Sequence, residues 1–217
     1  MKKIVKNFLD TIRIGSSAGK SLLFFWLKND LKKIQSKVAA DLGGGSMDNT
    51  KFFKSDKYIC VDIDQSKLDI GKKANPNAIV INSKIQDFLK NYKLEENVDL
   101  LVCVQTIGTN KFFEHEESLS TIKQMYYFLE QGGSLIFNLG TYNTNLNKLE
   151  KQLNEFFYGK FESMKIKTYG AFHVTLKKDA HWTKKLFLVY LMNFFIPLRT
   201  LFGFRKKKIY IFCEKKI

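Results

Sequence analysis

The sequence predicts an α/β fold: a mostly parallel sheet of seven strands with helices on both faces and an antiparallel last strand. Three observations support this prediction. From residue 37 onward, short apolar runs alternate with amphipathic segments of helical period. Residues 98–104 are almost entirely apolar, as expected for a central strand that is buried on both faces. A turn of three glycines follows the first apolar run.

Seven segments have the length and apolar content of strands. They span residues 38–42, 58–61, 78–82, 98–104, 134–139, 161–168 and 208–214. Helices are expected where apolar residues recur every three or four positions. They span residues 4–35, with a break at 15–17, and then 66–73, 116–129 and 145–157. The glycine pair at 132–133 is expected to end the third of these helices.

The chain of 217 residues is long enough for one domain with a substantial core. We expect four parts within that domain. They are an N-terminal helical cap (1–36), a ligand-binding core (37–169), an apolar and basic helical insertion (170–207) and a final strand (208–217).

The glycine turn indicates a nucleotide-like ligand. Gly43 to Gly45 follow the first strand, and the second apolar run ends at Asp62, nineteen residues after Gly43. Glycines let the backbone bend sharply and approach a ligand closely. A carboxylate at the end of the second strand can accept hydrogen bonds from both ribose hydroxyls.

Asp41 indicates which nucleoside this turn binds. It precedes the first glycine by two residues, where a carboxylate would repel a pyrophosphate, and Asp48 replaces the third glycine of G-x-G-x-x-G. Two acids around the turn suit a cationic ligand without phosphate. S-adenosylmethionine has an ammonium group, a sulfonium and a ribose. The alternative is an ordinary strand–turn–strand with a flexible glycine loop.

The segment D-L-G-G-G-S resembles the first motif of the class I S-adenosylmethionine-dependent methyltransferases, and V-D-I-D resembles their second-strand acid. These enzymes have a Rossmann-like sheet whose last two strands form an antiparallel pair. The resemblance implies that S-adenosylmethionine is bound by Asp41, Gly43, Gly45, Asp62 and Ile63.

Later segments follow the order of the same family as far as about residue 140. Ser83 follows the third strand, where the family usually has an Asp that contacts the adenine amino group, and the next amide, that of Lys84, would contact a ring nitrogen. Gln105 and Thr106 end the fourth strand, beside the expected methyl group. The Asn/Asp-Pro-Pro-aromatic motif of enzymes that methylate base amino groups is absent there, which disfavours that reaction but leaves ribose and ring-carbon methylation open.

An oxygen acceptor can require a general base, most often His. His115, about ten residues after the fourth strand, is the leading candidate, and a capping His before a helix is the alternative. His173 and His181 flank the insertion, while Tyr142 and Asn143 follow the fifth strand and could line the site. No residue spacing suggests a metal site.

The composition predicts a cytoplasmic protein with an anionic partner surface. The net charge is +15, and the last 41 residues hold eleven Lys or Arg against two acids. The three cysteines lie in apolar runs and suit buried, reduced thiols. We expect no secretory signal at the N-terminus, because its apolar stretch is too short.

Residues 186–198 form an apolar block between basic clusters. As a helix the block would be about 20 Å long, whereas a bilayer core is about 30 Å thick. An interfacial helix on anionic lipid at the inner face of the cell membrane therefore suits it. A helix that covers the sheet and a homodimer interface are the alternatives. Nucleic acid is disfavoured, because basic residues and aromatic residues are not interleaved.

Together these observations predict a methyltransferase that uses S-adenosylmethionine to O-methylate a small molecule or a lipid-linked sugar. An RNA methyltransferase, a nicotinamide-dependent enzyme and a non-catalytic binding protein remain as alternatives.

Overall fold

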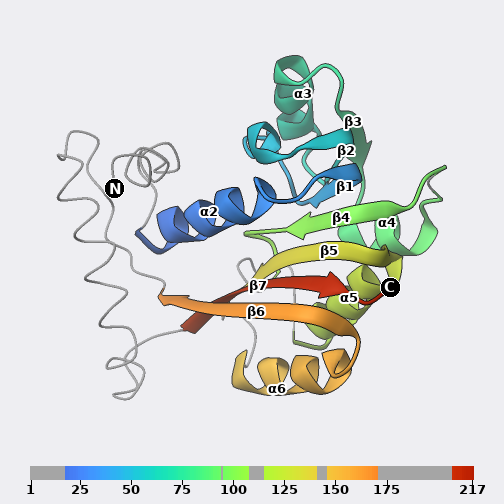
Figure 1. Cartoon of the computed structure of the whole chain (residues 1–217). Coiled ribbons are helices and arrows are strands. Elements are labelled where there is room, and N and C mark those ends of the chain that lie inside the picture. The colour runs from blue at the N-terminus through green and yellow to red at the C-terminus, as the bar shows by residue number, and fades with distance from the viewer. Residues whose placement is uncertain (1–17, 94, 108–114, 141–145, 171–206) are drawn as a thin grey trace.

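The computed structural model describes residues 18–93, 95–107, 115–140, 146–170 and 207–217 (Figure 1). A seven-stranded sheet in the order β3-β2-β1-β4-β5-β7-β6 runs through these residues. The strands are β1 (Ser36–Leu42), β2 (Ser55–Asp62), β3 (Ile79–Asn82), β4 (Val98–Cys103), β5 (Leu129–Leu139), β6 (Phe161–Gly170) and β7 (Lys207–Lys215).

The strand pairing confirms the predicted topology. Strands β1 to β5 are parallel, and β7 lies between β5 and β6, antiparallel to both. The chain moves outward from β1 to β2 and β3, and then returns to the other side of β1 for β4 and β5. In open α/β sheets, ligands bind outside the carboxyl ends of the strands where the order reverses in this way.

Helices cover both faces of the sheet, as predicted (Figure 1). They are α2 (Ala18–Leu31), α3 (Gln65–Ala74), α4 (Ile85–Asn91), α5 (His115–Phe128) and α6 (Leu146–Phe157), with a 3-10 turn η1 (Thr50–Phe52). Buried side chains of α2 and α3 share one hydrophobic core, and those of α4, α5 and α6 share the other. In α6 the buried positions are Leu146, Leu149, Leu153 and Phe157, which form one face at helical spacing.

Two elements differ from the sequence prediction. Helix α4 was not predicted, although Ile85, Phe88 and Leu89 have the i, i+3, i+4 spacing of a buried helical face. Strand β5 begins at Leu129, before the glycine pair that was expected to separate helix from strand. The pairing of β4 with β5 is irregular between Val98 and Leu100, and the chain passes through the glycines within the strand.

The remaining strands are confirmed, with ends that differ by a few residues. The helix predicted over residues 4–35 ends earlier than expected, because α2 ends at Leu31 and β1 begins at Ser36. Residues 1–17 of that cap and 171–206 of the insertion lie outside the described residues. Within the part of the chain that the structure describes, no helix has both the length and the apolar character needed to cross a membrane. Cys60, Cys103 and Cys213 are buried and unpaired, as predicted.

Candidate functional site

The glycine turn after β1 has a backbone that only glycine adopts readily. Gly43 has a φ of +74° and Gly45 a φ of +53°. An ideal Cβ on Gly43 would collide with Oγ1 of Thr106, which lies three residues beyond the end of β4. The turn is therefore fixed by its conformation and by the close approach of the neighbouring strand end.

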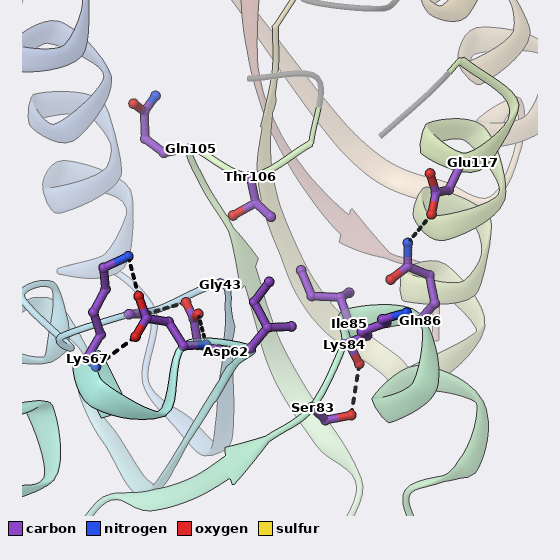
Figure 2. Close-up of a pocket in the computed structure, with 13 residues that line it drawn as sticks. Gly43, Asp62, Lys67, Ser83, Lys84, Ile85, Gln86, Gln105, Thr106 and Glu117 are labelled. Atoms are coloured by element: carbon purple, nitrogen blue, oxygen red, sulfur yellow. Dashed lines mark hydrogen bonds and ion pairs between the residues drawn. The ribbon is translucent and has the colours of Figure 1, made fainter. Parts of the chain in front are cut away.

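Asp62, the last residue of β2, holds the same turn from the other side. One carboxylate oxygen accepts a hydrogen bond from the Gly45 amide at 2.8 Å, and the other accepts from the Asp64 amide at 2.9 Å. A carboxylate oxygen can accept two hydrogen bonds, so each keeps acceptor capacity for a ligand. The side chain faces a cavity at the carboxyl ends of the strands (Figure 2).

This cavity has a volume of about 540 Å³, within the range of sites for small ligands and cofactors. Seven of the eight residues predicted to bind the cofactor line it. They are Gly43, Gly45, Asp62, Ile63, Ser83, Lys84 and Gln105. The cavity brings together the ends of β1, β2, β3 and β4, which lie far apart in the sequence.

Asp41 is the eighth predicted residue, and the structure places it elsewhere. Its side chain is 1% exposed and accepts a hydrogen bond from the Tyr58 hydroxyl at 2.9 Å. Burial and the nearby Asp41 carboxylate raise the pKa of Tyr58 well above its usual value. Asp41 is not among the residues that line the cavity. Its carboxylate lies beneath the glycine turn, whereas the sequence analysis expected it to face the ligand.

Six further residues line the cavity, and only Thr106 among them was assigned to the site from the sequence. They are Asp64, Lys67, Ile85, Gln86, Thr106 and Glu117. Asp64 caps α3 by accepting from the Lys67 amide at 3.2 Å, and its carboxylate pairs with the Lys67 ammonium at 2.8 Å. These bonds to Lys67, with a further one from Ser66, lower the pKa of Asp64. The sequence signal that could have identified Asp64 is its place directly before a predicted helix, where an Asp caps the helix N-terminus.

Gln105 has a φ of +64°, which is uncommon for a residue other than glycine. The backbone amide of Gln105 donates to Oδ1 of Asn138, a residue with no solvent exposure. The Asn138 amide group in turn donates to the Tyr169 hydroxyl at 3.0 Å. This buried pair holds the strand end that carries Gln105 and was not foreseen from the sequence.

His115, the predicted general base, begins α5 but is not among the residues that line the cavity. Its Nε2 lies 2.7 Å from Oε1 of Gln152 on α6, and its side chain is 16% exposed. The remaining candidates from the sequence, Tyr142, Asn143, His173 and His181, lie outside the described residues.

No protein-family model matches this chain, and no curated protein matches it. Solved structures do. The plantazolicin methyltransferase BpumL in complex with S-adenosylhomocysteine (SAH) is 13% identical, with a TM-score of 0.55, and the match covers 100% of this chain and 90% of that one. The N-methyltransferase NodS from Bradyrhizobium japonicum is 11% identical, with a TM-score of 0.57 and coverage of 92% and 97%.

An rRNA methylase from Streptococcus thermophilus is 12% identical, with a TM-score of 0.50 and coverage of 89% of this chain and 96% of that chain. Plantazolicin and rRNA are different acceptors, so the similarity concerns the common sheet and not the acceptor. Together with the strand order and the antiparallel β7, these matches establish that the chain has the class I S-adenosylmethionine-dependent methyltransferase fold.

Proposed function

We propose that this protein is an S-adenosylmethionine-dependent methyltransferase and that the cavity beside the glycine turn binds the cofactor. The observation that carries the proposal is the position of Asp62. Its carboxylate lies at the carboxyl end of β2, braces the glycine turn through the Gly45 amide and lines the cavity. An acid at this place in an open α/β sheet suits the hydroxyls of a ribose.

The residues present fit this cofactor. Gly43 and Gly45 adopt positive φ values and line the cavity with backbone, and the cavity volume suits one small molecule. Asp62 would accept from the ribose hydroxyls, while Ile63, Ser83 and the amide of Lys84 would surround the base. Gln105 and Thr106 would lie toward the reacting end. The bound cofactor supplies a methyl group on a sulfonium, which is already an activated leaving group.

The protein's own task in such a reaction is to position the reactants. The bracing of the turn by Asp62 and the fixing of the Gln105 backbone by Asn138 serve this purpose, because both hold cavity residues before a ligand arrives. His115 remains a candidate base, and its contact with Gln152 would have to open if it were to reach an acceptor.

Calorimetric titration with SAH tests the cofactor assignment. We expect wild type to bind SAH and Asp62→Ala to bind about 1.5–3 kcal/mol more weakly, because a charged acceptor is lost. Asp62→Asn keeps one acceptor oxygen and should lose less. Asp56→Ala is the matched control, since Asp56 is an exposed residue on the same strand and is not among the cavity residues.

Absence of SAH binding to wild type, or equal affinity of Asp62→Ala and wild type, would contradict this assignment. A thermal shift with NAD and none with SAH would favour a nicotinamide-dependent enzyme. Failure to bind either ligand would favour a non-catalytic role for the fold.

For the acceptor, we propose a hydroxyl group on a small molecule or on a sugar carried by a lipid at an anionic membrane surface. Its support is the sequence of the insertion, in which the apolar residues 186–198 stand between Lys184, Lys185 and the basic run 205–208. The full chain should sediment with vesicles that contain phosphatidylglycerol but not with neutral ones. Lys184→Glu combined with Lys185→Glu should weaken sedimentation, and no sedimentation of wild type at low salt would refute the membrane part.

An RNA acceptor is the second candidate. The net charge of +15 and the fold similarity to an rRNA methylase favour it. RNA binding that is tight at low salt and falls steeply with ionic strength would support it, because released counterions produce that dependence. Weak RNA binding at low salt would leave the hydroxyl acceptor as the better proposal.

A further inference from the structure

The wall of the cavity opposite Asp62 carries the carboxylate of Glu117, which the cavity has in addition to those of Asp62 and Asp64. Glu117 lies in the first turn of α5 and accepts a hydrogen bond at 2.8 Å from the side-chain amide of Gln86, in the first turn of α4. Both residues line the cavity. Figure 2 shows this pair on the far side of Ile85 from Asp62. One end of the cavity thus holds the Asp62 carboxylate, and the other holds a carboxylate oriented by an amide.

Between these two ends the cavity has apolar walls. Ile63 is 58% exposed although it is a large apolar residue, and Ile85 is 6% exposed. Both line the cavity. An apolar side chain left open beside a cavity gains free energy when a flat apolar surface covers it. A purine attached to a ribose at Asp62 would lie along these isoleucines, with its far edge toward Gln86 and Glu117.

The chemistry of that far edge separates one purine from another. An ionised carboxylate only accepts hydrogen bonds, and one bond from Gln86 leaves Glu117 with further acceptor positions. Adenine presents an amino group, which donates, at the position where hypoxanthine and guanine present an oxo group, which only accepts. Glu117 therefore matches adenine and opposes a 6-oxo purine.

Ser83 is the other side chain at this end that could contact the base edge. Its hydroxyl donates to the Lys84 carbonyl at 3.0 Å, so its hydrogen is already used by the backbone of the next residue. A neutral hydroxyl that accepts discriminates less strongly than a carboxylate, because hydrogen bonds to charged groups are about twice as strong.

We infer that Glu117, oriented by Gln86, accepts a hydrogen bond from the exocyclic amino group of the cofactor's adenine and makes the site selective for an adenosyl ligand. The inference rests on the proposed function, because it takes the ligand to be S-adenosylmethionine or its product. It assigns the selection of the base to a residue of α5 and leaves the ribose to Asp62.

Calorimetry with two ligands tests the inference. SAH is compared with S-inosylhomocysteine, in which an oxo group replaces the amino group of the base. Wild type should bind SAH about tenfold to a hundredfold more tightly. Glu117→Gln should bind SAH more weakly and lose or reverse this preference, because its amide can donate to the oxo group. Glu116→Gln is the matched control, since Glu116 is the neighbouring residue, is exposed and is not among the cavity residues.

Glu117→Gln and Glu116→Gln should unfold at the same temperature as wild type, because both positions are exposed. If Glu117→Gln keeps the wild-type preference for SAH, the inference is wrong, and a loss of preference in Ser83→Ala would give the role to Ser83. If wild type binds neither ligand, the proposed function fails as well. Binding of SAH with an unchanged preference in the variant overturns the inference alone.

Discussion

Asp62 borders the cavity above the glycine turn and Asp41 lies in the interior beneath it, and the two regions use these aspartates in opposite ways. Asp62 borders the cavity, and its partners are the backbone amides of Gly45 and Asp64. Asp41 is fully enclosed and accepts from the Tyr58 hydroxyl. An acid that uses backbone amides at a cavity wall can still bind a ligand, whereas an acid paired with a buried hydroxyl supports the fold. The side-chain direction, more than the residue type, decides the role.

The glycine turn separates these two regions, and its substitution should have the largest effect. In Gly43→Ala the turn still requires a left-handed backbone at φ +74°, which alanine adopts poorly, and the new methyl group collides with Oγ1 of Thr106. The backbone alone costs about 1–2 kcal/mol, and with the collision we expect about 3 kcal/mol or more of lost stability. SAH binding should fall below detection. Urea denaturation and calorimetry measure the two effects.

Gly159→Ala is the control for this substitution. Gly159 has nearly the same φ, +72°, but an added Cβ would meet no atom within 4 Å. It should lose only the backbone contribution and bind SAH as wild type does. Equal losses of stability in the two variants would mean that the contact with Thr106 does not constrain the turn.

Asp41→Ala should lower stability by less than Gly43→Ala does, and it should distinguish the structural role of Asp41 from the binding role of Asp62. Tyr58 is 8% exposed, and without Asp41 its hydroxyl loses its acceptor, which typically costs about 1–3 kcal/mol. The free energy of unfolding should therefore fall, while the folded protein keeps its affinity for SAH. Asp41→Asn retains an acceptor oxygen and should lose less. A loss of SAH binding at unchanged stability would instead indicate that Asp41 contacts the ligand, as the sequence suggested.

These two aspartates also show how far the sequence could predict the site. Local patterns were sufficient for the glycine turn and for the acid at Asp62, because each depends on residues close in the chain. The antiparallel last strand was implied by the family resemblance. The direction of the Asp41 side chain was not predictable, since it depends on Tyr58, which β2 brings alongside β1. Glu117 and Gln86 meet only because α4 and α5 pack together on one face of the sheet.

Helix α4 and the early start of β5 also differ from the sequence prediction, because the local sequence patterns there were short or favoured another structure. The spacing of Ile85, Phe88 and Leu89 indicates helix α4, but seven residues give a short pattern. The pair Gly132 and Gly133 is typical of a helix end. In this protein the helix ends earlier, and Gly132 adopts its φ of +74° within β5.

The smallest predicted effect is the contribution of one thiol beneath the turn, that of Cys60, to a loss of stability at alkaline pH. Burial, with a contribution from Asp41, raises the pKa of Cys60 above 9.0, its ordinary value. Between that value and the folded-state pKa, the unfolded chain releases a proton that the folded chain keeps. The free energy of unfolding therefore decreases as pH rises, by up to about 1.4 kcal/mol per pH unit for each such group. Tyr58, raised from 10.0, adds to the slope at higher pH.

Cys60→Ala tests whether part of the alkaline loss of stability arises from Cys60, beneath the turn. Cys103 and Cys213 are also buried with raised pKa values, so wild type should lose the contribution of three thiols between pH 9 and 10 and the variant that of two. Urea denaturation at pH 7, 9 and 10 measures the slope, and Asp56→Ala, at an exposed position that does not contribute to the raised Cys60 pKa, should leave it unchanged. Identical slopes in Cys60→Ala and wild type would mean that Cys60 titrates alike in the folded and unfolded chains. The region beneath the turn would then be more accessible to water than the enclosed Asp41 and Tyr58 indicate.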